Sequence, residues 1–501
     1  MFKKISALIR QLAGKPLPAI PGVPALSKRR RAAVAILLMF HLMGALSSLD
    51  ALMSSRTSQG SIAWIISLNT FPYVTVPVYW IFGRPKFQGY VISRRETDSD
   101  LWLKHQLKMS SVDRFQLQNS RIRGNMQAVE YLAKMPFLTG NAIEYLLDGQ
   151  HKFDSIFAGI REAEDYVLAQ YYIIRNDDIG QQFKRALIDK AEQGVPVFLL
   201  YDEIGSYRLG RPYLRDLERA GVQVRPFHST KGPGNRFQLN FRNHRKLVIT
   251  DGKHAWLGGA NIGDEYLGQS LRYGNWRDTH LKITGPAVMS VQLSFVEDWY
   301  WSSDMIPELN WEPVVAERGD LPILILPSGP ADRHETASLM MQHMIHSAVE
   351  RFWISSPYFV PDEGVLSALK LAALRGVDVR ILIPERTDNY LVYLAAYAFV
   401  APLIELGIEI HRYQDGVLHS KSFLVDHQVS SVGTVNLDNR SFRLNFEITA
   451  LIGGEEPNQR LEQIFQRDFD RSRIMTVEEI ENKSLFFRAL SRAAYLMAPV
   501  L

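Results

Sequence analysis

The apolar residues divide the chain into a short N-terminal part and a long remainder. Residues 32–53 and 61–83 are two mostly apolar runs of about 22 residues each. At about 1.5 Å per residue, either could cross a hydrocarbon core of about 30 Å. The first run is weakened by Asp50 near its end. The second contains Pro72 and Pro77, which a membrane helix tolerates as kinks. The pattern predicts an N-terminal transmembrane helical hairpin.

Basic residues lie on both outer flanks of this predicted hairpin. Residues 1–31 hold eight Lys and Arg and no acidic residue, with apolar residues at helical spacing between them. Such a segment is typical of an amphipathic helix on an anionic membrane surface, although a solvated basic tail is the alternative. Arg84, Lys86, Arg94 and Arg95 follow the second apolar run. The positive-inside rule therefore predicts a multi-pass protein whose large C-terminal part is cytoplasmic. A signal peptide fits less well, because a second apolar run follows at once.

The remainder repeats one alternation of helices and strands. A helical pattern at 151–165 precedes a β-rich run at 166–174, and a second pattern at 336–350 precedes a run at 351–361. In each repeat two helix–glycine–strand units follow, and the glycines are Gly194, Gly221, Gly376 and Gly407. Glycine between a helix and a Val/Ile-rich run ends the helix before a strand. We therefore expect an α/β fold made of two similar halves with mixed sheets.

These patterns give the predicted domain boundaries. After the basic segment 1–31 and the hairpin 32–83, residues 84–140 form a polar connector. The first α/β half spans 141–318 and the second spans 319–501. The second half ends in an amphipathic tail from residue 484, which either touches the membrane or docks on the domain.

Composition removes several functional classes. The chain has no cysteine, which excludes disulfides, thiolate nucleophiles and cysteine metal sites. Its net charge of +4 is too small to indicate a nucleic-acid binder. Nothing in the sequence resembles a glycine-rich nucleotide loop or a metal-binding motif, so we expect neither a cofactor nor a metal.

Each half carries the same polar motif, HxK(x4)D(x6)GxxN. The first copy is His244, Lys246, Asp251, Gly258 and Asn261, and the second is His419, Lys421, Asp426, Gly433 and Asn436. All four spacings are identical in the two copies. One HxK tripeptide carries no information, but two full motifs inside a repeated fold are a strong signal of function.

The residue types suit phosphoryl chemistry. A histidine and a lysine two residues apart on a strand project to the same face, so a nitrogen nucleophile and a fixed positive charge can meet one phosphate. Asn261 and Asn436 can donate amide hydrogens to the phosphate oxygens. If the halves face each other, one imidazole can attack phosphorus while the other protonates the leaving alkoxide. Asp251 and Asp426 belong to the motif, but we interpret them as residues that tie down local backbone.

Each histidine needs an acceptor that fixes its tautomer and makes it basic. Asp278, in Trp-Arg-Asp-Thr-His, and Glu447, in Asn-Phe-Glu, are the downstream candidates. Each would accept a hydrogen bond from the second ring nitrogen. An ordinary surface salt bridge is the alternative for either carboxylate.

With these motifs the chain resembles the phospholipase D superfamily, whose signature is this motif in duplicate. The stretches GTVNLDNRSFRLNFE at 433–447 and SPYFVPD at 356–362, with the two apolar runs, look like bacterial cardiolipin synthases. The resemblance implies a metal-independent enzyme of the bacterial inner membrane. Phosphatidylglycerol would donate its phosphatidyl group to a histidine and release glycerol, and a second phosphatidylglycerol would attack to give cardiolipin. The superfamily usually has serine or threonine at Gly259, so only Thr434 would offer a phosphate-binding hydroxyl.

Several alternatives stay open at this point. Another phospholipase D-type phosphatidyltransferase, a phospholipase, a membrane-tethered nuclease and a non-catalytic lipid-binding scaffold use the same framework. The expected partners are phosphatidylglycerol, cardiolipin and an anionic membrane, without nucleic acid, and a homodimer is compatible with the sequence. We expect His244 to be the nucleophile and His419 the general acid. The basic loop before His244 either grips anionic headgroups or is a solvated hairpin.

Overall fold

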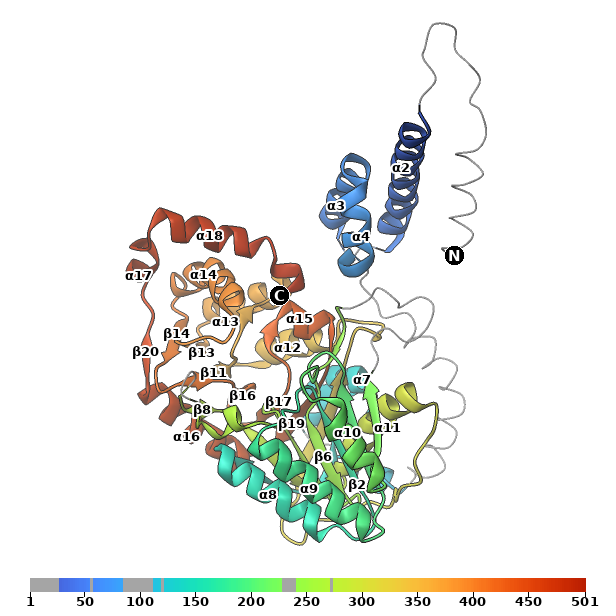
Figure 1. The fold of residues 1–501 in the computed structure, drawn as a ribbon. Coiled ribbons are helices and arrows are strands. Elements are labelled where there is room, and N and C mark those ends of the chain that lie inside the picture. Colours follow the sequence, from blue (N-terminus) through green and yellow to red (C-terminus); the bar gives the residue numbers. More distant parts are fainter. Residues whose placement is uncertain (1–26, 55–56, 84–110, 119–120, 228–239, 271–273) are drawn as a thin grey trace, which may run out of the picture. The chain divides into compact units, whose positions relative to one another are not determined.

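The computed structural model describes residues 27–54, 57–83, 111–118, 121–227, 240–270 and 274–501 (Figure 1). Most of the predicted basic segment 1–31, much of the connector 84–140 and most of the basic loop before His244 lie outside the described residues. The chain forms two compact units, of which one contains the N-terminal helices and the other contains the α/β halves.

The N-terminal unit is a hairpin of helices. Helix α2 (Lys28–Ser54) is followed by α3 (Ser58–Thr70), α4 (Pro72–Val78) and a π-helical turn, η1 (Tyr79–Gly83). Among the described residues, α2 is the one helix long and apolar enough to cross a membrane. The second apolar run is interrupted rather than kinked, because Phe71 leaves the helical region (φ −131°, ψ 57°). Proline disfavours helical backbone at the residue before it, and Pro72 then begins α4.

The polar residues that weaken the first apolar run hold this hairpin together. Asp50 accepts a hydrogen bond from the hydroxyl of Tyr79 at 2.8 Å, and Ser47 accepts one from the indole of Trp80 at 3.1 Å. The hydroxyl of Ser48 accepts a third, from the amide of Asn69, at 2.8 Å. Bonds of this kind join helices in an apolar environment, where the hydrophobic effect does not.

The second unit contains one continuous mixed sheet built from two copies of the same strand order (Figure 1). In the first half the order is β1 (Leu138–Leu146), β9 (His280–Thr284), β7 (His254–Gly258), β6 (Leu247–Thr250), β2 (Val167–Tyr171), β3 (Val197–Asp202) and β4 (Gln223–Phe227). In the second half it is β10 (Leu321–Ser328), β19 (Asn445–Gly453), β17 (Val429–Gly433), β16 (Ser422–Val425), β11 (Arg351–Ser355), β13 (Asp378–Pro384), β14 (Glu409–Tyr413) and β20 (Ser472–Ile474). The halves join where β1 pairs antiparallel with β10. The predicted α/β duplication is thus confirmed.

Helices cover both copies of the sheet. The first half has α8 (Gly149–Glu162), α9 (Asp178–Glu192), α10 (Arg211–Arg219) and α11 (Val288–Ser303). The second half has α12 (Thr336–Ser347), α13 (Glu363–Leu374), α14 (Tyr390–Ile404) and α16 (Glu455–Asp470). All four helix-stop glycines named from the sequence have positive φ, between 83° and 93°. Only glycine adopts that backbone without strain, so each marks the change from helix to strand.

Short strands cross between the halves and position the polar motifs. β5 (Arg242–Asn243) pairs in parallel with the start of β19, in the other half. β15 (Val417–Leu418) pairs in parallel with β8 (Trp276–Arg277), again in the other half. Each motif histidine follows one of these crossing strands directly. Both histidines therefore lie at the interface of the two halves.

Candidate active site

Both histidines lie in short links where the chain changes its pairing partner. His244, Arg245 and Lys246 separate β5, which pairs with the second half, from β6, which pairs within the first half. His419, Ser420 and Lys421 stand in the same way between β15 and β16 (Ser422–Val425). The prediction that His and Lys share a regular strand is therefore wrong in detail. The peptide N–H groups of His244 and His419 still donate across the interface, to Phe446 at 2.9 Å and Arg277 at 2.7 Å.

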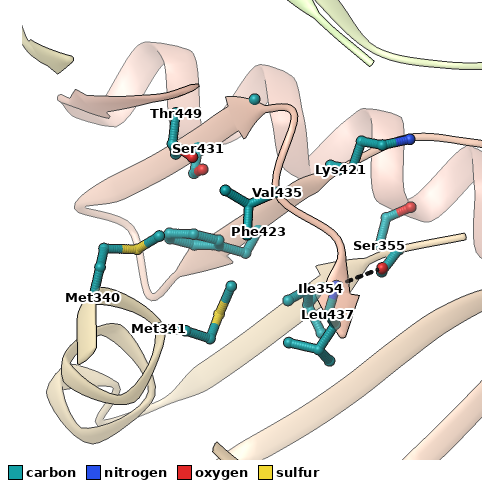
Figure 2. Close-up of a pocket in the computed structure, with 12 residues that line it drawn as sticks. Met340, Met341, Ile354, Ser355, Lys421, Phe423, Ser431, Val435, Leu437 and Thr449 are labelled. Carbon is teal, nitrogen blue, oxygen red and sulfur yellow. Dashed lines mark hydrogen bonds between the residues drawn. The ribbon is translucent and has the colours of Figure 1, made fainter. Parts of the chain in front are cut away.

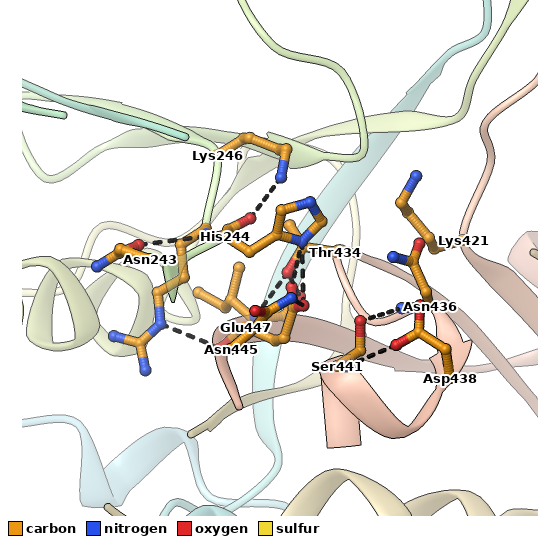
Figure 3. A network of polar contacts seen from close by, with 12 residues as sticks. Asn243, His244, Lys246, Lys421, Thr434, Asn436, Asp438, Ser441, Asn445 and Glu447 are labelled. Carbon is orange, nitrogen blue, oxygen red and sulfur yellow. Dashed lines mark hydrogen bonds and ion pairs between the residues drawn. The ribbon is translucent and has the colours of Figure 1, made fainter. Parts of the chain in front are cut away.

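The histidine-orienting carboxylates are exchanged between the halves. Nδ1 of His244 lies 2.8 and 3.0 Å from the two carboxylate oxygens of Glu447, which is in the second half (Figure 3). Nδ1 of His419 lies 2.9 Å from a carboxylate oxygen of Asp278, which is in the first half. An ionised carboxylate can only accept, so each imidazole carries its proton on Nδ1. Nε2 of each ring is left with its lone pair.

Burial sets the charge states of these pairs. It lowers the pKa of His244 to about 4, against the opposing effect of Glu447. It also lowers the pKa of His419, and the charge of Lys421 adds to this effect. Burial opposes ionisation of Asp278, but the hydrogen bond with His419 and the charge of Lys421 outweigh it and lower the pKa of Asp278 to about 2. Both pairs therefore combine a neutral imidazole with an ionised carboxylate at neutral pH.

The two lysines bring their side-chain nitrogens to the same place. Lys246 and Lys421 are 0% and 3% exposed, and each donates to the carbonyl of the histidine two residues before it. The ammonium of Lys421 also lies 2.8 Å from Nδ1 of His419. In Figure 3 the imidazole of His244 lies between the ends of Lys246 and Lys421. Burial lowers the pKa of Lys246 well below its usual value. It lowers the pKa of Lys421 to about 8, so Lys421 is still mostly charged at pH 7.

The motif aspartates lie at the far ends of their strands. The carboxylate of Asp251 accepts hydrogen bonds from the peptide N–H groups of residues 164, 165 and 166, at 2.8 to 3.2 Å. Asp426 accepts from residues 349, 350 and 351 over the same range. Both aspartates have positive φ, in tight turns. Each aspartate therefore holds the strand that follows its motif histidine and lysine against the neighbouring strand.

The predicted phosphate-binding residues differ between the halves. The amide of Asn261 is used within the protein, because it donates to the hydroxyl of Tyr266 at 2.9 Å and accepts from the N–H of Ile173. Asn436 has a buried carbonyl oxygen without a hydrogen-bond partner, and it lies beside Lys421 in Figure 3. The hydroxyl of Thr434 is bonded to the backbone of Ile448 on β19 (2.9 and 3.3 Å). The structure thus brings Asn436 to the lysines, while Thr434 faces β19.

Three comparisons with known proteins bear on this site. Residues 156–286 and 341–469 match the family model described as "Cardiolipin synthase, PLD-like domain". The chain is 43% identical to Cardiolipin synthase A of Pseudomonas entomophila (strain L48), over 92% of this chain and 97% of that one. It is also 43% identical to Cardiolipin synthase A of Pseudomonas putida (strain W619), over 93% and 98%. The chain belongs to the cardiolipin synthase family.

Membership of this family makes the chain a phosphatidyltransferase that associates with a membrane and acts on phospholipids. A crystal structure of phosphatidylserine synthase from Haemophilus influenzae Rd KW20 has the same fold, with a TM-score of 0.58 at 17% identity. It covers 75% of this chain and 100% of the other. The predicted phospholipase D-like architecture is confirmed. At this identity the likeness speaks for the fold alone.

The structure accounts for the glycine that departs from the superfamily pattern. A Cβ atom at Gly259 would lie 2.5 Å from one carboxylate oxygen of Asp278 and 2.7 Å from the other. Asp278 could not then keep its present position against His419. Thr434, at the corresponding position, stands beside the longer side chain of Glu447. Burial opposes ionisation of Glu447, but His244 and Lys246, with a smaller contribution from Thr434, outweigh it and lower the pKa of Glu447. Glycine in the first half therefore makes room for the shorter carboxylate.

Two aromatic residues of the site were not found from the sequence. Tyr172 meets the imidazole of His244 edge-on with ring centroids 5.1 Å apart, and Trp276 lies 5.1 Å from His419. Each comes from the first half, at the end of β2 or in β8. Both limit the positions that an imidazole can take. Aromatic residues are common in this sequence, so their position in the chain gave no signal.

Two buried arginines support the carboxylates, and the sequence did not reveal them either. Arg245 donates to the main-chain oxygen of Glu447 at 3.0 Å and pairs with Asp298 at 2.8 Å. Arg277 donates to the main-chain oxygen of Asp278 and pairs with Asp468 at 2.7 Å. Each guanidinium thus fixes the backbone of one histidine-orienting residue. The ion pairs join residues 53 and 191 positions apart, which no local pattern indicates.

A small pocket lies behind the second motif (Figure 2). Met340 and Met341 of α12 and Phe423 of β16 form its apolar side, and Lys421 borders it. Ser355 and Thr449 line it with buried hydroxyls that have no hydrogen-bond partner. Polar groups of this kind are usually satisfied by ordered water. Among the described residues, no group of three or more His, Asp or Glu could hold a metal ion.

Proposed function

We propose that this chain transfers a phosphatidyl group from one phosphatidylglycerol to another through a phosphatidyl-histidine, with release of glycerol. The observation that carries the proposal is the exchange of carboxylates. Each motif histidine is held by a carboxylate of the opposite half, with its Nε2 free and with two buried lysines nearby. This geometry provides two nitrogen bases and two cations around one phosphate.

The reaction balances in two displacements. In the first, Nε2 of His244 attacks phosphorus, the bond from phosphorus to the glycerol oxygen breaks, and His419 gives that oxygen its proton. In the second, the terminal hydroxyl of another phosphatidylglycerol gives its proton to His419 and attacks phosphorus. The phosphorus–nitrogen bond then breaks and cardiolipin leaves. His244 is neutral again, and His419 is again protonated.

Substrate binding lets His419 take up from solvent the proton that it needs as an acid. In the free site burial keeps His419 mostly neutral, since its pKa is lowered. An anionic phosphodiester next to the ring favours the imidazolium and raises that pKa. Lys246, Lys421 and Asn436 would bind the phosphate oxygens and stabilise the charge that develops on them, Asn436 through its amide N–H groups. Asn261 and Thr434, whose polar groups already bond within the protein, would contribute through the shape of the site.

The roles of the two histidines follow from their surroundings. Both oxygens of Glu447 contact His244, which fixes its tautomer for attack. Lys421 lies 2.8 Å from the ring of His419, and a neighbouring cation makes an imidazolium more acidic. We therefore infer that His244 is the nucleophile and that His419 is the acid and then the base.

Lipid mass spectrometry of the purified, reconstituted full chain tests this function. With phosphatidylglycerol as the sole lipid substrate, we expect one glycerol released for each cardiolipin formed. We expect the chelator EDTA to leave the rate intact, because Lys and Asn stand where other enzymes place Mg²⁺. His244→Asn protein is the control. Phosphatidic acid as the main product would identify a phospholipase, and no turnover would support a lipid-binding scaffold.

We further propose that both apolar N-terminal runs span the bacterial inner membrane and that the α/β unit is cytoplasmic. The chain has no cysteine, so single cysteines can be labelled specifically. Ser58→Cys, at the start of α3, should react with a membrane-impermeant maleimide in intact cells. Gln193→Cys, exposed at the end of α9, should react only after lysis. The reverse pattern would contradict this topology.

A further inference from the structure

The C-terminal helix α18 (Leu485–Tyr495) packs its inner face on α14. Ser491 and Ala494 are buried there, and the hydroxyl of Ser491 donates to the carbonyl of Leu394 at 2.9 Å. Aromatic contacts fix both ends, Phe487 with Tyr397 at 5.0 Å and Tyr495 with Phe399 at 5.2 Å. The inner face of α18 is therefore already buried, as the apolar face of an ordinary surface helix would be.

The outer face of α18 is also apolar. Leu485, Phe486 and Leu496 are 81%, 74% and 77% exposed. Leu485, Ala489, Arg492 and Leu496 are spaced at i, i+4, i+7 and i+11, so they lie along one stripe of the helix and its continuation. A soluble protein seldom leaves large apolar side chains on the outside of a helix whose inner face is already packed.

The charges on this face are of one sign. Arg488 and Arg492 are exposed, and residues 484–501 contain no acidic residue. An exposed face that combines large apolar side chains with arginine alone matches a bilayer with an anionic surface. A protein partner gives no comparable reason for the absence of carboxylates from this stretch.

We propose that the outer face of α18, formed by Leu485, Phe486, Arg488, Arg492 and Leu496, binds the surface of an anionic bilayer. The contact is additional to any made by the N-terminal helices. The choice of phosphatidylglycerol as the anionic lipid rests on the proposed function. The binding surface itself does not depend on which reaction the site performs.

The docked helix is joined to the active-site region. The turn after α18, η4 (Ala498–Val500), contacts α15 (Asn439–Arg443). The N–H of Arg440 on α15 donates to the carbonyl of Leu501 at 2.7 Å. α15 is capped by Asp438, which follows Asn436 of the second motif by two residues. Binding of α18 to a bilayer would therefore fix the orientation of this side of the site toward the lipid.

Probes at single cysteines test the contact directly. Phe486→Cys in the full chain, labelled with an environment-sensitive fluorophore, is reconstituted in phosphatidylglycerol vesicles. Its emission should shift to the blue, and lipids brominated on their acyl chains should quench it. The matched control is Leu374→Cys at the end of α13, an apolar residue that is 70% exposed. Its label should stay in water. Equal emission and quenching at the two positions would overturn the proposal.

Kinetics separates membrane contact from folding. The triple variant Leu485→Ser, Phe486→Ser, Leu496→Ser should lose about tenfold in kcat/KM on phosphatidylglycerol vesicles, because apolar burial holds the helix in the interface. It should keep its rate on a soluble short-chain phosphatidylglycerol, and Leu374→Ser should change neither rate. An equal loss on both substrates, or no loss, would contradict the inference. If the label at Phe486→Cys shifts to the blue but the chain makes no cardiolipin, the proposed function is overturned. The proposed membrane contact of α18 is then still supported.

Discussion

The two halves of the α/β unit share a strand order but differ in what surrounds the motif. Twelve residues after the motif histidine, the first half has Trp256 and the second has Ser431 (256 − 244 = 431 − 419). Trp256 is fully buried and donates to Ser155, while Ser431 lines the small pocket of Figure 2. A duplicated backbone therefore does not imply a duplicated interior. The first half is filled at this point, and the second leaves space.

The arginines that support the two carboxylates show that similar contacts can also arise from positions that do not correspond. Arg245 and Arg277 do not occupy corresponding positions, since Ser420 follows the second histidine where Arg245 follows the first. Yet each arginine donates to the carbonyl of a histidine-orienting residue and pairs with an aspartate, Asp298 on α11 for Arg245 and Asp468 on α16 for Arg277. The same physical requirement has thus been met from two places in the chain. Both histidines are thus held by a carboxylate whose backbone an arginine fixes, although the contacts of the two rings differ in detail.

The largest expected effects concern the two histidines. His244→Asn and His419→Asn should each reduce turnover by roughly 10⁴-fold or more, because the pair acts as a unit. They should differ in what accumulates. With a substrate that has a good leaving group, His419→Asn should retain a phosphatidyl adduct on His244, since no base activates the acceptor. Peptide mass spectrometry reads the modified residue. An adduct on His419 in the His244→Asn protein would reverse the assignment.

Substitution of a histidine-orienting carboxylate should impair the histidine of the opposite half. Glu447→Gln and Asp278→Asn should each lower kcat by roughly 10² to 10⁴-fold, because the charge that stabilises an imidazolium and its tautomer is lost. With a substrate that has a good leaving group, adduct formation needs no acid, so Glu447→Gln should slow this step although Glu447 is in the second half. Asp278→Asn should then slow only acceptor transfer from the adduct. Single-turnover quenching with this substrate separates the steps, and exposed Glu456→Gln is the control. Loss at the same step in both would contradict the assigned roles.

Replacement of either supporting arginine should lower the free energy of unfolding by a similar amount. Arg245→Met and Arg277→Met each leave a buried aspartate without its guanidinium, which typically costs about 3–5 kcal/mol. Thermal unfolding of the detergent-solubilised protein measures the loss. Adding Asp298→Asn to Arg245→Met, or Asp468→Asn to Arg277→Met, should recover part of it, because the unpaired charge is removed. A single variant as stable as the wild type would show that its half does not need the support.

The features that could be predicted from the sequence are those with a local pattern in the chain. The alternation of helices and strands in two halves follows from helix–glycine–strand units, and the motif spacing identified both histidines and both lysines. Asp278 and Glu447 were found because few carboxylates lie near the motif strands. Their exchange between halves could not be predicted, because it depends on β5 and β15, two-residue strands without a periodic signal. Trp276 and Arg277 are set by the same crossing pairs, which form only when the halves meet.

A buried lysine gives the smallest and most selective test of the comparison. Lys152 on α8 is 3% exposed, and its ammonium lies 4.0 Å from the ring centroid of Phe153 and 5.8 Å from that of Tyr266. Ala337 is the corresponding residue of the second half. Lys152 stands 14 positions before Tyr166, whose N–H bonds to Asp251, and Ala337 stands 14 positions before Arg351, whose N–H bonds to Asp426. At this position the first half therefore has a buried lysine that acts on Asp278, and the second half has alanine. Burial lowers the pKa of Lys152 to about 7, and Asp278 opposes this change.

The sign of its effect can be worked out. Lys152 is charged below about pH 7, and that charge helps to lower the pKa of Asp278. Because Asp278 is bonded to His419, we expect the same charge to disfavour the imidazolium of His419. The charged groups that act on Lys152 are Asp148 and Asp278, and those that act on His419 are Lys421, Asp278 and Asp388. The Lys152→Met variant keeps all of these groups and removes only the charge of Lys152. The variant should therefore raise the pKa of His419 and leave that of His244 unchanged.

The pH profile of kcat/KM on a soluble short-chain phosphatidylglycerol measures this shift. The falling limb at high pH, which reports protonated His419, should move up by roughly one pH unit in Lys152→Met. The rising limb, which reports neutral His244, should not move. Lys190→Met is the matched control, because Lys190 is also buried in the first half but bonds to Ala163 and Gln193. A profile that is lowered without a shift would mean that Lys152 only supports the fold. In that case the charge of Lys152 could not contribute to the different roles of the two histidines.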